Sequence, residues 1–115
     1  MAATSLSLLT LTVAATGTIA QHRFVTPAGL QTGAGENAIG ASLTAAVSGA
    51  KIPVQHLGIA SVEAGAAITA GASLKADADG KAITWVTSGA KLGIARTAAA
   101  ASGDVIEVLL IPNLA

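Results

Sequence analysis

Residues 75–85 read KADADGKAITW, and this stretch predicts the first element of the fold. Asp79 and Gly80 stand between two runs in which apolar and polar residues alternate. A period of two is typical of a half-buried β-strand, and an Asp-Gly pair suits a tight turn, so the stretch predicts a β-hairpin. Asp77 and Asp79 also resemble the start of a calcium loop. We favour the turn because Ser88 stands where that loop needs a glutamate.

The same signals extend outward from this hairpin in both directions. Val, Ile and Thr crowd short segments, and 13 Gly residues interrupt the chain. Roughly a quarter of the residues are Ala, the best helix former, but the frequent glycines leave few windows for a helix. We therefore predict an all-β fold, a small β-barrel or sandwich with short strands, Gly/Ala-rich loops and an extended N-terminal strand or arm. The further predicted strands are 5–13, 18–26, 38–43, 51–62, 91–96 and 105–111, with one helical turn at 97–103.

Two predicted strands change the face on which their apolar residues fall. The change at Leu8–Leu9 predicts either a bulge or a strand buried on both faces, and the change near His56–Leu57 predicts a bulge or kink. A length of 115 residues indicates one domain, 1–115. Within it we expect an N-terminal β arm or hairpin over 1–27 and a β core over 38–115.

The chain also shows internal similarity. IGA at 39–41 and SGAKIPV at 48–54 align with LGI at 92–94 and SGDVIEV at 102–108, and the tetrapeptide LGIA occurs at 57–60 and 92–95. The repeated unit is a short strand, a loop of small residues, a Ser-Gly turn and a second strand. Two such units suit a small barrel or sandwich better than a solenoid, which needs more copies.

The amino-acid composition limits the classes of function that the chain can have. Hydrophobic residues make up 52 % of the chain and charged residues 10 %, with a formal net charge of zero. Alanine buries little area, so the core is expected to be thin and to gain stability from partner subunits or another surface. The low charge argues against nucleic-acid binding. The lack of cysteine excludes disulfides, thiolate zinc sites and cysteine nucleophiles.

The apolar run at residues 5–20 could be a signal-peptide core, but it has no basic residue before Arg23, so we favour a β-strand. No stretch is long and apolar enough to predict a membrane helix. GAGENA at 33–38 lacks the strand, helix and acidic residue of a dinucleotide site. His22 and His56 lack partners for metal binding or catalysis. We predict no catalytic, cofactor-binding or metal-binding residue, no cofactor, no small-molecule substrate and no enzymatic activity.

The remaining candidates are apolar residues that could contact another protein. The N-terminal Leu/Thr strand and the last strand carry most of them. Phe24 and Trp85 are the only aromatic residues, and for Trp85 filling of the core is the favoured alternative. The candidate interface residues are Leu6, Leu8, Leu9, Leu11, Val13, Phe24, Trp85, Leu109 and Ile111.

Three pieces of sequence, in this order, carry a resemblance to a known family. They are VEAGAAITAGASLKADADGKA at 62–82, the GIAR strand with its AAAASGD loop at 93–104, and VIEVLLIPN at 105–113. Together with LSLLTLTVAATGTIAQHRFVTPAG at 6–29, they make the chain similar to the capsid cement, or decoration, proteins of tailed phages. The loop SLTAAVSGAKIPVQ at 42–55 departs from the family, whose members often carry a more acidic version, and this affects the partner surface.

The resemblance implies a β-rich subunit, made in the host bacterial cytoplasm, that assembles on the outer capsid surface of the virion. It implies a homotrimer, with a dimer as the alternative. The subunit would bridge neighbouring major capsid proteins, stabilise the expanded lattice and resist the pressure of packaged DNA. Two alternatives stay open. One is another self-assembling structural subunit, such as a coat, tail or surface-layer protein, and the other is a small secreted binding module.

Overall fold

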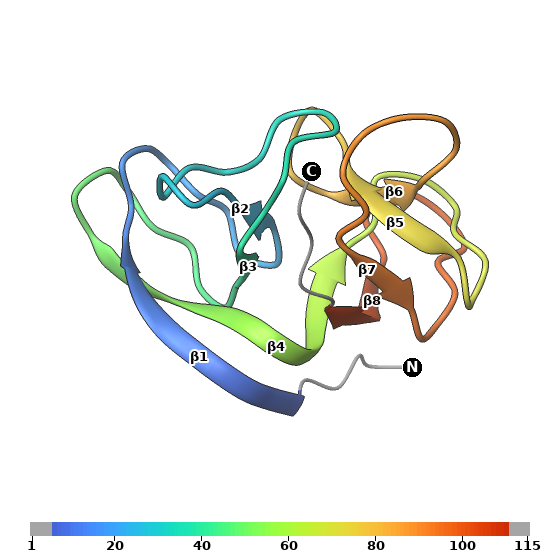
Figure 1. Cartoon of the computed structure of the whole chain (residues 1–115), viewed down its shortest axis with the longest axis horizontal. Helices are drawn as coiled ribbons and strands as arrows, with labels where there is room; N and C mark the ends of the chain where they lie inside the picture. Colours follow the sequence, from blue (N-terminus) through green and yellow to red (C-terminus); the bar gives the residue numbers. More distant parts are fainter. Residues whose placement is uncertain (1–5, 111–115) are drawn as a thin grey trace.

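The computed structural model describes residues 6–110, and within this range it contains β-strands and no α-helix (Figure 1). This confirms the all-β prediction. The strands are β1 (Leu6–Ala14), β2 (Phe24–Val25), β3 (Gly40–Ser42), β4 (Lys51–Glu63), β5 (Ser73–Ala76), β6 (Ala82–Thr84), β7 (Gly93–Ala95) and β8 (Val105–Leu110).

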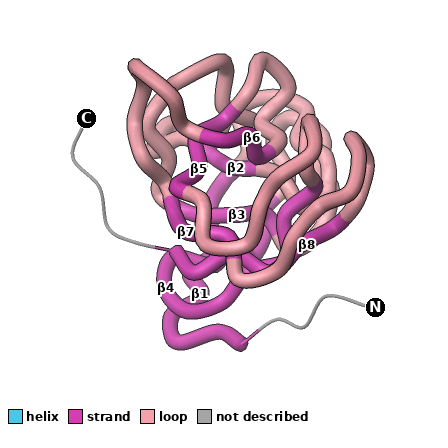
Figure 2. The backbone as a smooth tube through the Cα atoms, turned by 90° about the vertical axis from the view of Figure 1, so that its right-hand side faces the viewer, coloured by secondary structure: helices cyan, strands magenta, loops and turns pink. Residues whose placement is uncertain are grey.

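All paired strands run antiparallel in one sheet with the order β2-β3-β4-β8-β7-β5-β6, and β1 pairs with the other edge of β4. A bridge between Ala64 and Ala82 brings the end of β4 to β6, so the sheet nearly closes into a barrel. Figure 2 shows loops over most of the molecule, with the β1–β4 pair projecting at the bottom.

The predicted hairpin at residues 75–85 is present as β5 and β6, which pair from Leu74–Thr84 to Ala76–Ala82. The Asp77 carboxylate accepts hydrogen bonds from the backbone N–H groups of Asp79 and Lys81, at 2.8 and 2.9 Å. Gly80 has a φ of 75°, which favours glycine. The aspartates therefore build the turn between these strands.

Both predicted irregularities are present, and they face each other. The β1–β4 register skips Leu8 on one strand and His56 on the other, between the pairs Ser7–Gly58 and Thr10–Gln55. The buried Gln55 side chain lies at this point, and its amide donates to the carbonyl oxygens of Leu6, Leu57 and Ile59. It thereby satisfies carbonyl groups where the ladder is interrupted.

The internal similarity seen in the sequence corresponds to two halves with one pattern of pairing, which we call the first half (residues 6–54) and the second half (residues 55–110). In the first half, Ile19 and Ala46 exchange backbone hydrogen bonds of 2.8 and 2.9 Å. In the second half, Ile68 and Ala99 do the same at 2.9 Å. The Ala15 N–H donates to Ala50, and equivalently the Ala64 N–H donates to Asp104.

The halves share β4. Its first part pairs with β3 and β1, and its second part pairs with β8, so the strand orders β2-β3-β4-β1 and β5-β7-β8-β4 are equivalent. Leu6 corresponds to Gln55, and Thr10 corresponds to Ile59. The pair Leu6–Ile59 therefore has the pair Thr10–Gln55 as its equivalent.

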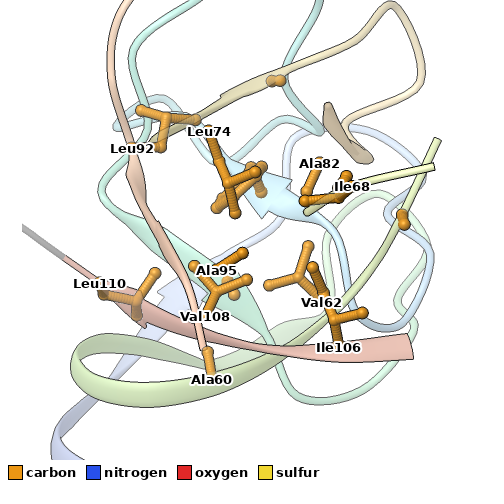
Figure 3. Close-up of a cluster of buried hydrophobic side chains, with 14 of the residues drawn as sticks. Ala60, Val62, Ile68, Leu74, Ala82, Leu92, Ala95, Ile106, Val108 and Leu110 are labelled. Carbon is orange, nitrogen blue, oxygen red and sulfur yellow. The ribbon is translucent and has the colours of Figure 1, made fainter. Parts of the chain in front are cut away.

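Two hydrophobic clusters fill the halves unequally. The larger one lies mainly in the second half (Figure 3) and includes Ala60, Val62, Ile68, Leu74, Ala82, Leu92, Ala95, Ile106, Val108 and Leu110. The smaller one lies in the first half and comprises Ala15, Ile19, Val25, Ile52 and Val54. Phe24 and Ala41 of the first half join the larger cluster, which couples the two halves.

Two local predictions were wrong. The predicted strand 18–26 is reduced to β2, because the chain turns at Gln21–His22 and His22 has a φ of 62°. The predicted helical turn at 97–103 is absent, because Ala99 pairs with Ile68 in a bridge instead. At residues 97–103, pairing with a distant segment overrides the helix preference of the alanines. The end of the predicted strand 105–111, at Ile111, lies outside the described residues.

Candidate interaction surfaces

Strand β1 carries four exposed leucines. Their exposed fractions are 59 % for Leu6, 74 % for Leu8, 39 % for Leu9 and 49 % for Leu11. An antiparallel strand at a protein surface normally turns its apolar residues to the core and polar residues to water. Here apolar side chains on both faces of β1 are exposed, and the described part of the chain covers only the end of this strand, at Val13.

A row of aliphatic side chains continues from β1 across the sheet. Leu6 lies opposite Ile59, Ile59 opposite Leu109, and Leu109 opposite Ile94. Directly opposed residues of antiparallel strands lie on the same face, so these four residues form one row, which we call the aliphatic row. Leu109 and Ile94 are 41 % and 37 % exposed, and Ile59 is half-buried. The row contains no charged residue, as expected of a protein-binding patch.

Ile59 and Ile94 were not among the predicted interface residues, although the sequence held a signal for them. Both are the third residue of the repeated tetrapeptide LGIA. The next residues, Ala60 and Ala95, are buried in the larger cluster, so the alternation of the strand turns the isoleucines outward. Applying the same strand alternation to both tetrapeptides would have turned both isoleucines outward.

The other predicted interface residues lie elsewhere. The structure corrects the prediction for Phe24, which is fully buried because its side chain packs in the larger cluster and the loop at Gly80 covers its backbone. Val13 is half-buried against the smaller cluster. Trp85 is half-buried, its indole N–H donates to the Gly89 carbonyl at 2.8 Å, and the Lys91 ammonium lies 4.3 Å from its ring centre. Ile111 lies outside the described residues.

A second apolar surface lies at the tip of the first half. It is a shallow open hollow of about 610 Å³ lined by Thr18, Ile19, Ala20, Ala45, Ala46, Val47 and Ala50. Val47 is 67 % exposed. Part of the lining, Ala45, Ala46, Val47 and Ala50, belongs to the loop between β3 and β4.

The charged residues near the centre of the fold form ion pairs. The Glu63 carboxylate lies 3.2 Å from Arg23 and 3.3 Å from Lys81. Burial raises the pKa of Glu63, but the hydrogen bonds and positive charges of Lys81 and Arg23 outweigh it and hold the pKa below its usual range. Arg96 and Glu107 form a second pair at 3.0 Å. These groups tie β4 and β8 to neighbouring segments.

The histidines make structural contacts. The Nδ1 atom of His22 lies 3.1 Å from the Ser61 carbonyl oxygen, and that of His56 lies 2.8 Å from the Val54 carbonyl oxygen. Among residues 6–110, no three His, Cys, Asp or Glu side chains come together as a metal site would require. Within the same range, no helix is long and apolar enough to span a membrane.

Comparisons with known proteins agree with this architecture. A search of curated protein sequences finds no match. The structure is similar to the crystal structure of the head fiber gp8.5 N base of bacteriophage phi29, with a TM-score of 0.73 and 17 % sequence identity. The match covers 93 % of this chain and 98 % of that one, and it supports the fold.

The sequence itself carries a family signature. The model of the phage cement protein family matches residues 4–110, which include every described strand. The match extends through both halves of the duplicated sheet, and thus through the leucine-rich β1 and the β8 end of the aliphatic row. The chain therefore belongs to the phage cement protein family.

Proposed function

We propose that this chain binds the outer surface of a phage capsid and stabilises the expanded lattice by bridging neighbouring major capsid proteins. As a phage cement protein it is a capsid-associated structural protein. The family match over residues 4–110 is the observation that carries the proposal. Bridging and the outer placement are supported by the exposed apolar surfaces, which lie on two separate parts of the molecule.

The mechanism follows from binding linkage. A subunit that binds only the expanded lattice stabilises it by mass action, and many copies add their contributions. The aliphatic row and the hollow are two surfaces, so one subunit could contact two neighbouring molecules at once. Because both surfaces are uncharged, their binding should depend little on salt concentration.

Self-association is the second part of the proposal. We propose a homotrimer, with a dimer as the alternative, because the smaller cluster leaves β1 exposed and a second subunit would cover it. We propose that the chain functions without catalysis, a cofactor, nucleic acid or a membrane. The structural roles of its polar residues support this. Glu63 and Glu107 form ion pairs, and the Asp77 and Asp104 carboxylates accept hydrogen bonds from backbone N–H groups of turns.

The test is quantitative mass spectrometry of gradient-purified virions from the source phage. A ratio of this chain to the major capsid protein near one, or near a simple fraction, supports a lattice-wide structural subunit. Absence from mature particles would contradict the proposal. Assembly of the isolated chain into long polymers or shells would favour a coat, tail or surface-layer subunit instead.

Capsids that lack the chain allow a sharper test. Leu109→Asp places a charge in the aliphatic row and should weaken binding of the purified protein to such capsids by about tenfold or more, because a carboxylate would lose its hydration at the contact. Val86→Asp is the matched control, since Val86 is 69 % exposed and lies outside both apolar surfaces. Equal binding of both variants would remove the aliphatic row from the proposed contact.

A further inference from the structure

Strand β1 and its equivalent in the second half differ in how they are covered. Residues 10–14 of β1 correspond to residues 59–63 of β4. Ala60 and Val62 are fully buried, whereas their equivalents Leu11 and Val13 are exposed and half-buried. The fold therefore contains one covered and one uncovered copy of the same strand.

The Ala60 and Val62 side chains pack in the larger cluster, and the outer backbone edge of this second copy is covered by the first half. The His22 carbonyl oxygen accepts the Glu63 N–H at 2.9 Å, and the His22 ring lies against the Ser61 carbonyl oxygen. The Arg23 side chain continues this contact to the Glu63 carboxylate. Residues 21–23 thus lie along the outer edge of the second part of β4.

The equivalent segment of the second half is residues 70–72. Gly71 corresponds to His22, and both have a positive φ, 90° and 62°. Ala70 and Gly71 are exposed, and no described residue donates a hydrogen bond to the Gly71 carbonyl oxygen. In Figure 1 the loop between β4 and β5, which contains them, lies on the side of the molecule away from β1. This segment therefore cannot cover β1 of its own chain.

The outer edge of β1, on the side away from β4, has backbone N–H groups that can make such a contact. Because the Ala15 N–H donates to Ala50, the alternation of the strand turns the Ala14 N–H away from β4, as it turns the Glu63 N–H away from β8. Residues 6–14 and 64–74 contain no charged side chain, so two copies can approach here without repulsion. An exposed edge strand with free N–H groups is a template for pairing with another chain.

We propose that the outer edge of β1 binds residues 70–72 of a second copy of this chain. The contact would repeat, between two molecules, the one that residues 21–23 make with β4 within each molecule. It joins different surfaces of the two copies, so it forms a closed ring or an open polymer rather than a symmetric pair of β1 strands. The inference rests on the self-association in the proposed function and not on capsid binding.

The absence of cysteine from the chain makes crosslinking a clean test. Ala14→Cys and Ala70→Cys are prepared as separate full-length proteins, mixed, and treated with a short bifunctional maleimide. We expect the mixture to give a crosslinked dimer containing one of each variant, several-fold above either variant alone. Val86→Cys mixed with Ala14→Cys is the control for random encounters.

Two results would overturn the inference. One is a mixed yield no higher than the Val86→Cys control. The other is equally efficient crosslinking of Ala14→Cys with itself, which would indicate that two β1 strands pair with each other.

A second variant tests the edge directly. Thr12→Pro removes an N–H that points away from β4 and should weaken self-association about tenfold or more in sedimentation, with the circular dichroism spectrum retained. Thr12→Val keeps the N–H and should assemble normally. A folded Thr12→Pro protein that assembles like the wild type would overturn the inference. Efficient mixed crosslinking of Ala14→Cys with Ala70→Cys, together with a wild-type protein that never binds capsids, would contradict the proposed function and still support this contact.

Discussion

The two halves of the chain share one pattern of strand pairing but use it differently. At equivalent positions the second half buries Ala60, whereas the first half exposes the larger Leu11. Phe24 of the first half also packs in the larger hydrophobic cluster and not in the smaller one. The same backbone thus encloses a core in one half and presents apolar side chains to the outside in the other. Equal topology does not imply equal burial, and the less buried copy is where a partner is expected.

The largest expected effect tests the difference between the clusters. Ile68 and Ile19 are equivalent buried isoleucines. We expect Ile68→Ala to lower the free energy of unfolding by about 2–5 kcal/mol, and Ile19→Ala to fall near the lower end of that range. The reason is that Ile19 lines the open hollow, where neighbours can relax into the space.

Urea unfolding of both variants measures this difference. Val86→Ala, at a position that is 69 % exposed, is the control and should change stability by no more than about 0.5 kcal/mol. A larger loss for Ile19→Ala than for Ile68→Ala would reverse the comparison between the halves.

Much of the fold could be predicted because its signals are local. The Asp-Gly turn after Asp77 and the changes of parity at Leu8 and His56 are visible in the sequence, and the structure contains all three. The pairing of Ile19 with Ala46, and of Ile68 with Ala99, could not be predicted. Each joins loops far apart in sequence through single backbone bridges, which leave no period in the side chains.

The second prediction concerns the point where the halves meet. Gln55→Leu should lower the free energy of unfolding by about 1–3 kcal/mol, because the carbonyl oxygens of Leu6 and Ile59 would lose a buried donor. Gln21→Leu is the matched control, since its amide makes an exposed hydrogen bond. Chemical unfolding of the two variants gives the result. Equal losses would show that the Gln55 amide has no special role at the irregularity.

The third prediction uses a difference in charge between equivalent residues. Glu63 forms two ion pairs where its first-half equivalent is Ala14. The pKa of Glu63 is lowered below 4.5 in the folded protein, so its stabilising effect is present above about pH 4.5 and is lost as the pH falls through the folded pKa. At pH 7, Glu63→Gln should lower stability by about 1 kcal/mol.

Unfolding of the wild type and Glu63→Gln from pH 7 down to pH 3 tests the sign. The stability difference should shrink as the solution becomes more acidic. A difference that stays constant over this range, or grows toward low pH, would mean that the ionised carboxylate of Glu63 does not stabilise the fold.

The candidate surface could be predicted only in part. Leu6, Leu8, Leu9 and Leu11 followed from their alternation with Ser and Thr, because such a strand keeps an apolar face whether or not the chain covers it. Phe24 was misplaced because composition does not say which aromatic residue fills a core. Ile59 and Ile94 required the register that aligns four strands, and register depends on contacts between distant segments.

The smallest expected effect concerns a loop that distinguishes the halves. The Gly35 and Gly89 loops are equivalent and touch, since a Cβ atom built on Gly35 would lie 3.3 Å from the Gly89 Cα atom. Only the second-half loop carries an aromatic side chain, Trp85, beneath the Lys91 ammonium. Lys91→Gln should lower the free energy of unfolding by about 0.5–1 kcal/mol through loss of this cation–π contact. Because Trp85 is the only tryptophan, its fluorescence reports the loop directly. Lys51→Gln on β4 is the control. A change of Trp85 emission in Lys91→Gln but not in Lys51→Gln would show that the cation–π contact orders this loop. Unchanged emission and stability in both variants would mean that the contact does not order the loop.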